Sequence, residues 1–253
     1  MEKNKFQRIS LDSFHLKIIA IIAMLINHLG ASFQLSHSYP LIFCFTEIIG
    51  KITFPVMAFL LVEGFHYTHN VKKYASRLAI FWLISIYPFH WLHYPLKSLI
   101  TPDELVNNIF FTLLMGLLLI WSYSKITNKI MKIAIVVFFS LATILSDLNV
   151  IGPLIIFSFY IIKDKKKKVI IPMITMTSFI MLIYIILYFV YPASIPNIGI
   201  LLTGFGPLIN IPLLLSYNGK RGKNNAYIKW GFYWFYPVHL TLLAILRYLI
   251  LGW

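Results

Sequence analysis

The sequence predicts an all-α integral membrane protein that forms one polytopic helical bundle. Of its 253 residues 59% are hydrophobic and only 12% are charged, and the mean hydropathy is +0.80. Soluble domains carry roughly twice this charged fraction, about 25%. No internal repeat, low-complexity linker or change in composition divides the chain, so residues 1–253 are expected to form a single transmembrane domain.

The apolar residues gather into nine runs, each of which we interpret as a membrane span. A helix needs about 20 apolar residues to cross the bilayer, so the fourth and sixth runs are short and could instead be re-entrant. The predicted spans cover approximately residues 15–41, 41–67, 73–94, 107–123, 130–146, 149–162, 168–191, 197–216 and 229–251.

Loop charge favours a full crossing for both short runs. Alternate loops hold 19 of the 22 basic residues, whereas the other loops hold only Lys97 beside three carboxylates. Removing either short span would break this alternation. The positive-inside rule therefore predicts nine spans, with the N-terminus in the cytoplasm and the C-terminus outside. The 19 residues are Lys3, Lys5, Arg8, Lys17, Lys72, Lys73, Arg77, Lys125, Lys129, Lys132, Lys163, Lys165, Lys166, Lys167, Lys168, Lys220, Arg221, Lys223 and Lys229.

Several classes of protein are disfavoured. The net charge of +14 follows from the loop bias, and without a separate basic domain we expect no nucleic-acid partner. Cys44 is the only cysteine, so no intramolecular disulfide is expected. The histidines are scattered over several spans without an HExxH motif, so no metal site is expected. The first run is too long for a signal peptide and carries Asn27-His28 near its end.

In the first span, His28 is an ionisable group at membrane depth, where such groups are costly and usually functional. Lys17 precedes it by eleven residues, about three helical turns of roughly 3.6 residues each. The two side chains therefore share one helix face, about 16 Å apart along the axis. A surface cation and a deeper imidazole on one stripe fit the two ends of a long substrate.

The second and third spans carry further charges. Glu47 and Lys51 are four residues apart and can pair on one helix face, either as a structural ion pair or as part of a site. Glu63, near the cytoplasmic end of the second span, could be interfacial or could line a site. Lys73 and Arg77 begin the third span, either as topology signals or as phosphate contacts.

The later spans add polar candidates nearer the outer side. Asn107 is explained as a helix cap, whereas Asn108 could line an outer cavity, with Thr112 one turn deeper. Asp147 could cap the next helix or attract a cationic acceptor. His239, midway along the ninth span, is either hydrogen-bonded to a neighbouring helix or part of a site. The eighth span is expected to be a broken helix because it contains Gly204, Gly206, Pro207 and Pro212.

A series of sequence blocks resembles a known family. In this order the blocks resemble the TraX family of membrane pilin N-acetylases, within a wider group of membrane acyltransferases related to the family-3 acyltransferases. The resemblance covers nearly the whole chain and is densest from 15 to 116. The blocks are Lys17-Ile-Ile-Ala, Met24-Leu-Ile-Asn27-His28, Ile49-Gly50-Lys51-Ile-Thr-Phe54-Pro55, Phe59-Leu-Leu-Val-Glu63-Gly64-Phe65, Thr68-His69-Asn70, Tyr74 with Arg77-Leu78, Ser85-Ile-Tyr-Pro88-Phe89, Asn108-Ile-Phe-Phe111-Thr112 with Gly116, Pro212, Tyr217-Asn-Gly219 with Gly222, and Phe235-Tyr236-Pro237-Val-His239-Leu240.

This chain departs from the family pattern at two positions. TraX-like sequences usually carry Asp where this chain has Asn27, and Arg where it has Lys51. The first departure removes a carboxylate beside His28. Since Asn27→Asp would restore the usual pair, we expect from the resemblance that it does not reduce activity. The second departure removes a side chain that could make a bidentate contact.

The resemblance implies acetyl transfer from cytoplasmic acetyl-coenzyme A in a bacterial plasma membrane. The wider group places a basic residue and a histidine with ten residues between them, as in Lys17 and His28, and carries Ser-Gly-Phe where this chain has Glu63-Gly64-Phe65. Acceptors implied are a pilin-like peptide N-terminus or an envelope glycan, with N- or O-acetylation both open. The expected phosphate and coenzyme A residues are Lys17, Glu63, Lys73 and Arg77; the expected catalytic residues are His28 as general base, with Asn27, Asn108 or Thr112 orienting the acceptor.

Two other functions compete with acyl transfer. A proton-coupled transporter or a membrane immunity protein would also use a broken eighth helix and buried Glu47, Lys51 and His239. A degenerate acyltransferase acting only as an interaction partner would explain the loss of the carboxylate at Asn27. Transport predicts substrate flux without acetyl-coenzyme A, whereas the enzyme predicts an acetylated product that requires it.

Overall fold

The structure is a computed structural model that describes residues 10–33, 35, 39–95, 98–191 and 198–252. The predicted all-α fold is confirmed: within these ranges the chain forms helices, and the sole β-type pairing is one bridge between Leu11 and Tyr217. Lys3, Lys5, Arg8 and Lys97 of the charge pattern lie outside the described residues. The elements are α1 (Ser13–Ser32), α3 (Pro40–Gly50), α4 (Thr53–Tyr67), α5 (Val71–His93), η1 (Glu104–Val106), α6 (Ile109–Lys125), α7 (Lys129–Leu141), α8 (Ile151–Ile161), α9 (Lys165–Val190), α10 (Ile198–Leu202), η3 (Thr203–Ile209), α11 (Asn210–Leu215) and α12 (Ala226–Leu251).

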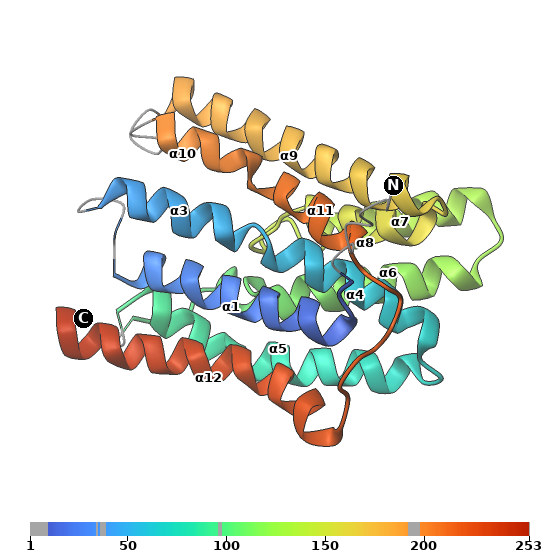
Figure 1. Ribbon diagram of the computed structural model, residues 1–253, viewed down its shortest axis with the longest axis horizontal. Coiled ribbons are helices and arrows are strands. Elements are labelled where there is room, and N and C mark those ends of the chain that lie inside the picture. The colour runs from blue at the N-terminus through green and yellow to red at the C-terminus, as the bar shows by residue number, and fades with distance from the viewer. Residues whose placement is uncertain (1–9, 34, 36–38, 96–97, 192–197, 253) are drawn as a thin grey trace, which may run out of the picture.

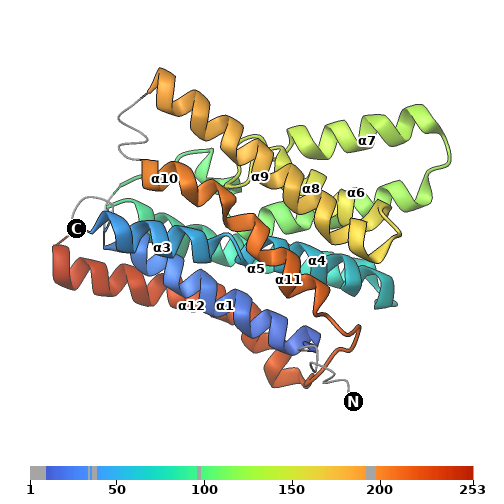
Figure 2. The ribbon, with the colours of Figure 1, turned by 45° about the horizontal axis from the view of Figure 1, so that its top comes forward.

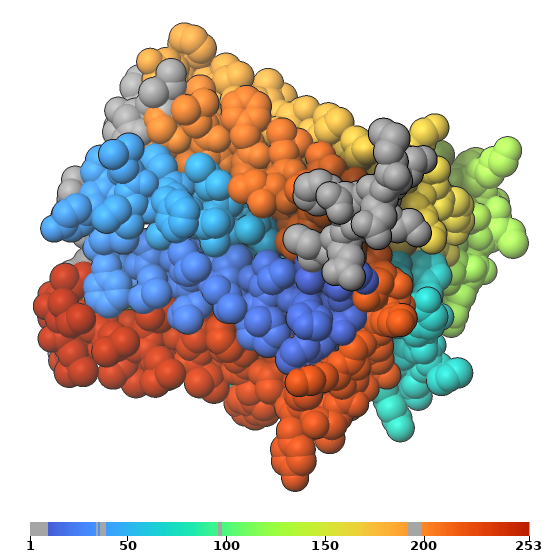
Figure 3. All heavy atoms as spheres, in the orientation of Figure 1, coloured from blue at the N-terminus to red at the C-terminus, as the bar shows by residue number. Residues whose placement is uncertain are grey.

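The helices run roughly along one direction, so the bundle has two ends (Figures 1 and 2). We call the end where α1, α5, α9 and α12 begin the basic end, on the right in Figure 1, and the opposite end the far end. In Figure 3, α1 lies between α12 and α3 on one face of the molecule. This position gives the polar residues of α1 neighbours on both sides.

The apolar helices are of two lengths. Four are long and apolar enough to cross a membrane by length and composition: Ser13–Ser32, Pro40–Tyr67, Lys165–Val190 and Ala226–Leu251. Three shorter apolar stretches, Ile109–Lys125, Ile151–Ile161 and Gly199–Leu215, accompany them. The first helix ends at Ser32, short of the predicted residue 41.

The predicted second span is two helices, α3 and α4, that meet at Lys51 and Ile52. Pro55 lies in the first turn of α4 and has no backbone N–H, so the carbonyl of Lys51 loses its usual helical donor. The Nδ2 group of Asn210 donates to this carbonyl instead, at 3.0 Å. The break between α3 and α4 is therefore stabilised by a residue of the predicted eighth span, which is distant in sequence.

The predicted broken eighth helix is confirmed, because a 3₁₀ segment, η3, separates α10 from α11. The glycines of η3 permit close packing. A Cβ atom built on Gly206 would lie 2.8 Å from the Cγ atom of Lys51, and one on Gly204 would lie 2.6 Å from the sulfur of Met181. Glycine therefore lets η3 approach both α3 and α9.

The core lies between α4, α6 and α8, while the outer helices expose apolar side chains. Leu117, Ile155 and Phe159 are fully buried, and a Cβ atom on Gly116 would collide with Ile156. By contrast, large apolar side chains remain exposed along the helices that flank the bundle, which suits a lipid environment rather than water. They include Ile130, Ile133 and Phe138 on α7, Leu182 and Phe189 on α9, and Leu242 and Leu249 on α12.

Candidate functional site

A cavity of about 610 Å³ enters the bundle at the basic end. Its walls come from α1, α4, α5, α6, α12 and the loop between α11 and α12. Four cationic side chains, Lys17, Arg77, Arg221 and Lys229, line it. The volume lies within the range of about 300–1,000 Å³ typical of small-molecule sites.

Aromatic side chains hold two of these cations in place. The Arg77 Nε–H group donates to the hydroxyl of Tyr233 at 3.4 Å, and its guanidinium lies 5.5 Å from the ring centre of Tyr74. The Lys17 ammonium lies 5.3 Å from the ring centre of Phe232. Lys17 and Arg221 are also close enough to repel each other, so an anion between them would relieve that repulsion.

One carboxylate, Glu63, also lines the cavity, but it is already paired. The ammonium of Lys168 donates to its Oε1 atom at 2.8 Å and also lies 5.2 Å from the ring centre of Phe59. Nearby, burial raises the pKa of Tyr217 to about 12, with the Glu63 charge as a second cause. Tyr217 is therefore a neutral hydrogen-bonding group in a wall that retains a positive balance.

The loop from 216 to 225 is tied to the start of α1. The backbone N–H of Leu11 donates to the carbonyl of Ser216 at 3.0 Å, and the N–H of Ser13 donates to the carbonyl of Lys220 at 2.9 Å. Gly222 has a φ of +68°, and a Cβ atom there would collide with the carboxylate of Asp12. The same carboxylate caps α1, because it accepts from the N–H of His15, which lowers the pKa of Asp12. This loop is a fixed wall, and it holds Arg221 at the cavity.

His28 and His239 form a pair between α1 and α12. The Nδ1 atom of His28 lies 2.8 Å from the Nε2 atom of His239, and the two rings are nearly parallel. The Nδ1 atom of His239 lies 2.7 Å from the carbonyl of Phe235, which can only accept, so this nitrogen carries a proton. In the neutral pair the Nε2 atom of His239 then accepts from Nδ1–H of His28. The Nε2 atom of His28 is left with its lone pair, as a general base requires.

The cavity does not reach this histidine pair. Lys17 lines it, but His28, on the same helix, does not. The wall includes Phe110 and Tyr233, and the ring of Tyr236 lies between Phe110 and the two histidines. The predicted stripe on α1 is thus divided between a cavity at one end and a histidine pair beyond it.

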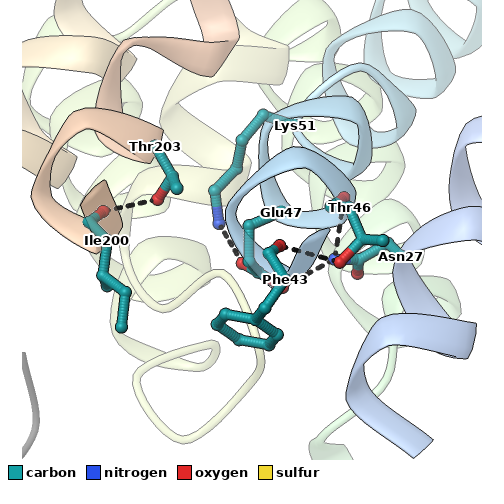
Figure 4. Close-up of polar contacts among 7 residues, drawn as sticks. All are labelled: Asn27, Phe43, Thr46, Glu47, Lys51, Ile200 and Thr203. Atoms are coloured by element: carbon teal, nitrogen blue, oxygen red, sulfur yellow. Dashed lines mark hydrogen bonds and ion pairs between the residues drawn. The ribbon is translucent and has the colours of Figure 1, made fainter. Parts of the chain in front are cut away.

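A second polar cluster joins α1 to α3 (Figure 4). The Asn27 amide donates to Oε1 of Glu47 at 2.7 Å, and the Lys51 ammonium reaches Oε2 of Glu47 at 3.3 Å. The predicted ion pair is therefore present, and a third member joins it. Gly50 allows this contact, since a Cβ atom there would lie 2.5 Å from the Asn27 side chain. Because the Asn27 amide is already bound to Glu47 of α3, the structure shows it in a structural contact. Its role in orienting an acceptor stays a prediction.

Two polar candidates of α6 are buried with hydrogen-bond partners. Asn108, rather than Asn107, caps α6: its Oδ1 atom accepts from the N–H groups of Phe110 and Phe111, and it is fully buried, away from the cavity. The cap predicted at Asn107 is thereby corrected, whereas a role of Asn108 in lining an outer cavity stays a prediction. Thr112 is also fully buried, with its hydroxyl 3.2 Å from that of Ser146.

The two remaining candidates are exposed. Asp147 does not cap α8, whose N-cap residue, Val150, makes no side-chain cap. That alternative was wrong, because Asp147 lies three residues too early. The carboxylate is exposed and interacts electrostatically with Lys51 and His93. Lys73 is exposed and lies outside the cavity wall, so its phosphate contact stays a prediction.

Sequence reasoning missed part of the cavity. Arg221 and Lys229 entered only as loop charges, and Tyr233 and Tyr236 were not singled out. Their spacing on α12 held a usable signal: positions 229, 233, 236 and 239 follow the i, i+3, i+4 pattern of one helix face. Among the described residues, no group of three or more His, Cys, Asp or Glu could hold a metal ion.

The fold and these sites define a helical protein with membrane-length apolar helices, a basic cavity and an interhelical histidine pair. The chain belongs to the TraX family, since the family model described as TraX protein matches residues 13–247. It is similar to the "Probable fimbrial assembly protein FimC, serogroup H1" of Dichelobacter nodosus, with 29% identity over 249 residues, or 94% of this chain and 96% of that protein. No solved structure matches. The resemblance inferred from the sequence blocks is confirmed.

Proposed function

We propose that this protein is a membrane acyltransferase that moves an acetyl group from acetyl-coenzyme A to an amine or hydroxyl acceptor of the cell envelope. The observation that carries the proposal is the cavity at the basic end, where four cations converge on a space of ligand size. Guanidinium and ammonium groups are the usual partners of phosphate, and coenzyme A carries its phosphates at the end remote from the thioester.

The shape of the cavity supports a two-part substrate. Lys17, Arg221 and Lys229 come from the basic end: Lys17 and Lys229 lie near the starts of α1 and α12, and Arg221 lies in the loop between α11 and α12. Its deeper wall is apolar and aromatic, with Leu61, Phe110 and other side chains from the helix interiors. The nucleotide would bind the cations, and the pantetheine arm would follow the apolar wall toward the histidine pair.

The chemistry follows from the free Nε2 atom of His28. The acceptor oxygen or nitrogen attacks the thioester carbonyl carbon while Nε2 takes the acceptor proton. The tetrahedral intermediate then collapses, the carbon–sulfur bond breaks, and the imidazolium returns its proton to the departing thiolate. Free coenzyme A and the acetylated acceptor are the products, and the imidazole is neutral again. His239 keeps Nδ1 of His28 occupied, so the lone pair stays on Nε2.

The acceptor belongs to the envelope in this proposal. The relative in Dichelobacter nodosus is named as a fimbrial assembly protein, which favours a pilin-like peptide N-terminus, with an envelope glycan as the other acceptor class. The acetyl donor is a substrate, and no metal is needed for the steps above.

The proposal also includes the topology. Nine crossings of the plasma membrane, with the N-terminus and the basic end in the cytoplasm and the C-terminus outside, would give coenzyme A direct access to the cavity. The helix order and the loop charges support this arrangement. The short helices α6 and α8 would cross within a bundle whose other helices cover them.

The test is binding of acetyl-coenzyme A to the purified full-length protein and transfer of labelled acetyl to an envelope peptide. Arg221→Gln should weaken binding by roughly 5- to 150-fold, the equivalent of about 1–3 kcal/mol for hydrogen bonds to a charged group. Lys223→Gln is the matched control, because Lys223 lies in the same loop but does not line the cavity. A pantetheine thioester without the nucleotide should lose no affinity. Equal losses for Arg221→Gln and Lys223→Gln, or no binding at all, would refute the proposal.

A further inference from the structure

The ring of Tyr236 stands between the cavity and the histidine pair. On one side its centre is 5.3 Å from that of Phe110, which lines the cavity. On the other side it is 6.2 Å from the His28 ring and 5.7 Å from the His239 ring. Tyr236 is only 4% exposed, so its ring is buried between Phe110 and the two histidines.

The cavity and the histidine pair lie on different sides of this ring. The cavity opens at the basic end, and neither histidine belongs to its wall. His28 is nevertheless partly exposed, so its accessible surface lies outside the cavity. His93, which is exposed at the end of α5, interacts with it electrostatically.

We infer that water reaches His28 from the far end, where α5 ends at His93, and that Tyr236, backed by Phe110, is a barrier that keeps a thioester bound in the cavity away from this water. This inference rests on the proposed function. A base with a free Nε2 atom activates water as readily as it activates an acceptor. Without a barrier, that water would hydrolyse the thioester to acetate and free coenzyme A. Transfer then requires the Tyr236 ring to move aside, and Tyr236 is a positioning residue rather than a catalytic one.

The position of the ring in α12 supports such movement. Pro237 follows it directly and has no backbone N–H, so the carbonyl of Tyr233 lacks its helical donor one turn earlier. The helix is therefore less constrained at the barrier than elsewhere along its length. The same turn carries Tyr233, which lines the cavity and accepts a hydrogen bond from Arg77. An occupied cavity would contact the helix at the turn that holds the barrier.

The experiment measures release of free thiol from acetyl-coenzyme A by the full-length protein without any acceptor. Tyr236→Ala should raise this hydrolysis by roughly tenfold or more, since general base catalysis contributes 10²–10⁴-fold once water reaches the thioester. Tyr236→Phe retains the ring and should stay at the wild-type rate. Trp234→Ala is the matched control, because it removes an exposed aromatic ring from the same helix outside the cavity wall. Adding His28→Ala to Tyr236→Ala should abolish the increase.

The outcomes separate this inference from the proposed function. If the wild-type protein binds acetyl-coenzyme A and Tyr236→Ala binds it equally but hydrolyses it no faster, the barrier is refuted. An increase that persists in the double variant with His28→Ala refutes it too. If Tyr236→Ala does not fold, Phe110→Ala removes the ring that backs Tyr236 on the cavity side. It should raise the same hydrolysis rate, and no increase would refute the barrier. Failure of the wild-type protein to bind acetyl-coenzyme A would instead overturn the proposed function.

Discussion

Replacing Asn27 by aspartate tests the cluster in Figure 4. The Asn27 amide donates to Glu47 at 2.7 Å, and an aspartate has the same shape but no donor when ionised. The substitution would therefore place two carboxylates in contact. Resemblance to the family favours a harmless change at this position, whereas the geometry predicts a harmful one.

The cost can be worked out for both charge states. With both carboxylates ionised at roughly 4 Å, the repulsion is about 4 kcal/mol at an effective dielectric constant near 20. Loss of the hydrogen bond adds about 1.5–3 kcal/mol, and Lys51, 3.3 Å from Glu47, offsets part of the total. Alternatively the pair holds one proton, which costs about 1.4 kcal/mol for each pH unit above an ordinary value near 4. That is about 5.5 kcal/mol at pH 8 but only about 1.5 kcal/mol at pH 5.

The sign of the pH dependence follows from proton binding. Between pH 5 and pH 8 the folded variant holds a proton that the unfolded chain has released, so its stability falls as the pH rises. We expect Asn27→Asp to match the wild type within about 1–2 kcal/mol at pH 5 and to lose about 3–5 kcal/mol at pH 8. In a thermal unfolding assay in detergent, the latter is a shift of roughly 6–20 °C. Asn27→Ala, which adds no charge, should show a smaller loss that does not vary with pH.

A second substitution should rescue the first. Where the family usually has arginine, this chain has Lys51, and a planar guanidinium can bridge two carboxylates. Adding Lys51→Arg to Asn27→Asp should therefore restore most of the stability at pH 8. If Asn27→Asp is as stable as the wild type at pH 8, or its deficit is the same at both pH values, the interaction described for Asn27 and Glu47 is wrong.

Three further predictions concern other parts of the molecule. His239→Phe removes the acceptor that orients His28. We therefore expect kcat to fall roughly 5- to 150-fold while the KM for acetyl-coenzyme A stays unchanged. A change of KM by the same factor as kcat would contradict this role. Gly222→Ala should lower the unfolding temperature, because it strains a φ of +68° and displaces the cap of α1, whereas Gly231→Ala, with open space around it, should not. Reporter fusions after Lys168 should lie in the cytoplasm and fusions at Trp253 outside; both on one side would refute nine crossings.

Local features of the sequence predicted much of the fold. Hydropathy located the helices because membrane-length apolar runs have few other stable structures. Side chains near helix starts also act locally: Asn70, Asn128, Asp164 and Asn225 each accept from an N–H group two or three residues later. The broken eighth segment followed from glycine and proline alone. The cap at Asn108 was assigned one residue early, since two adjacent asparagines offer the same signal.

The candidate site depended less on local sequence. His28 was singled out as a base because a lone ionisable group at membrane depth is unusual, and Lys17 and Arg77 were singled out by charge and position. Their companions were not predictable in the same way. Arg221 becomes part of the cavity only because the loop from 216 to 225 is hydrogen-bonded to the start of α1. Glu63 lines the cavity, and its expected contact with the cofactor stays a prediction; its ion pair with Lys168 on another helix was not predictable from local sequence.

The sequence by itself thus determined the class of protein, the approximate positions of most helices and the identity of one candidate base. Only the tertiary structure decided that His28 pairs with His239, that Asn27 binds Glu47, and that Tyr236 packs between Phe110 and the two histidines. The physical reason is the range of the forces involved. Hydropathy and capping act within a few turns of one helix, whereas these contacts depend on which helices pack together and at which rotation. The two histidines are 211 residues apart, and no local pattern specifies how α12 turns toward α1.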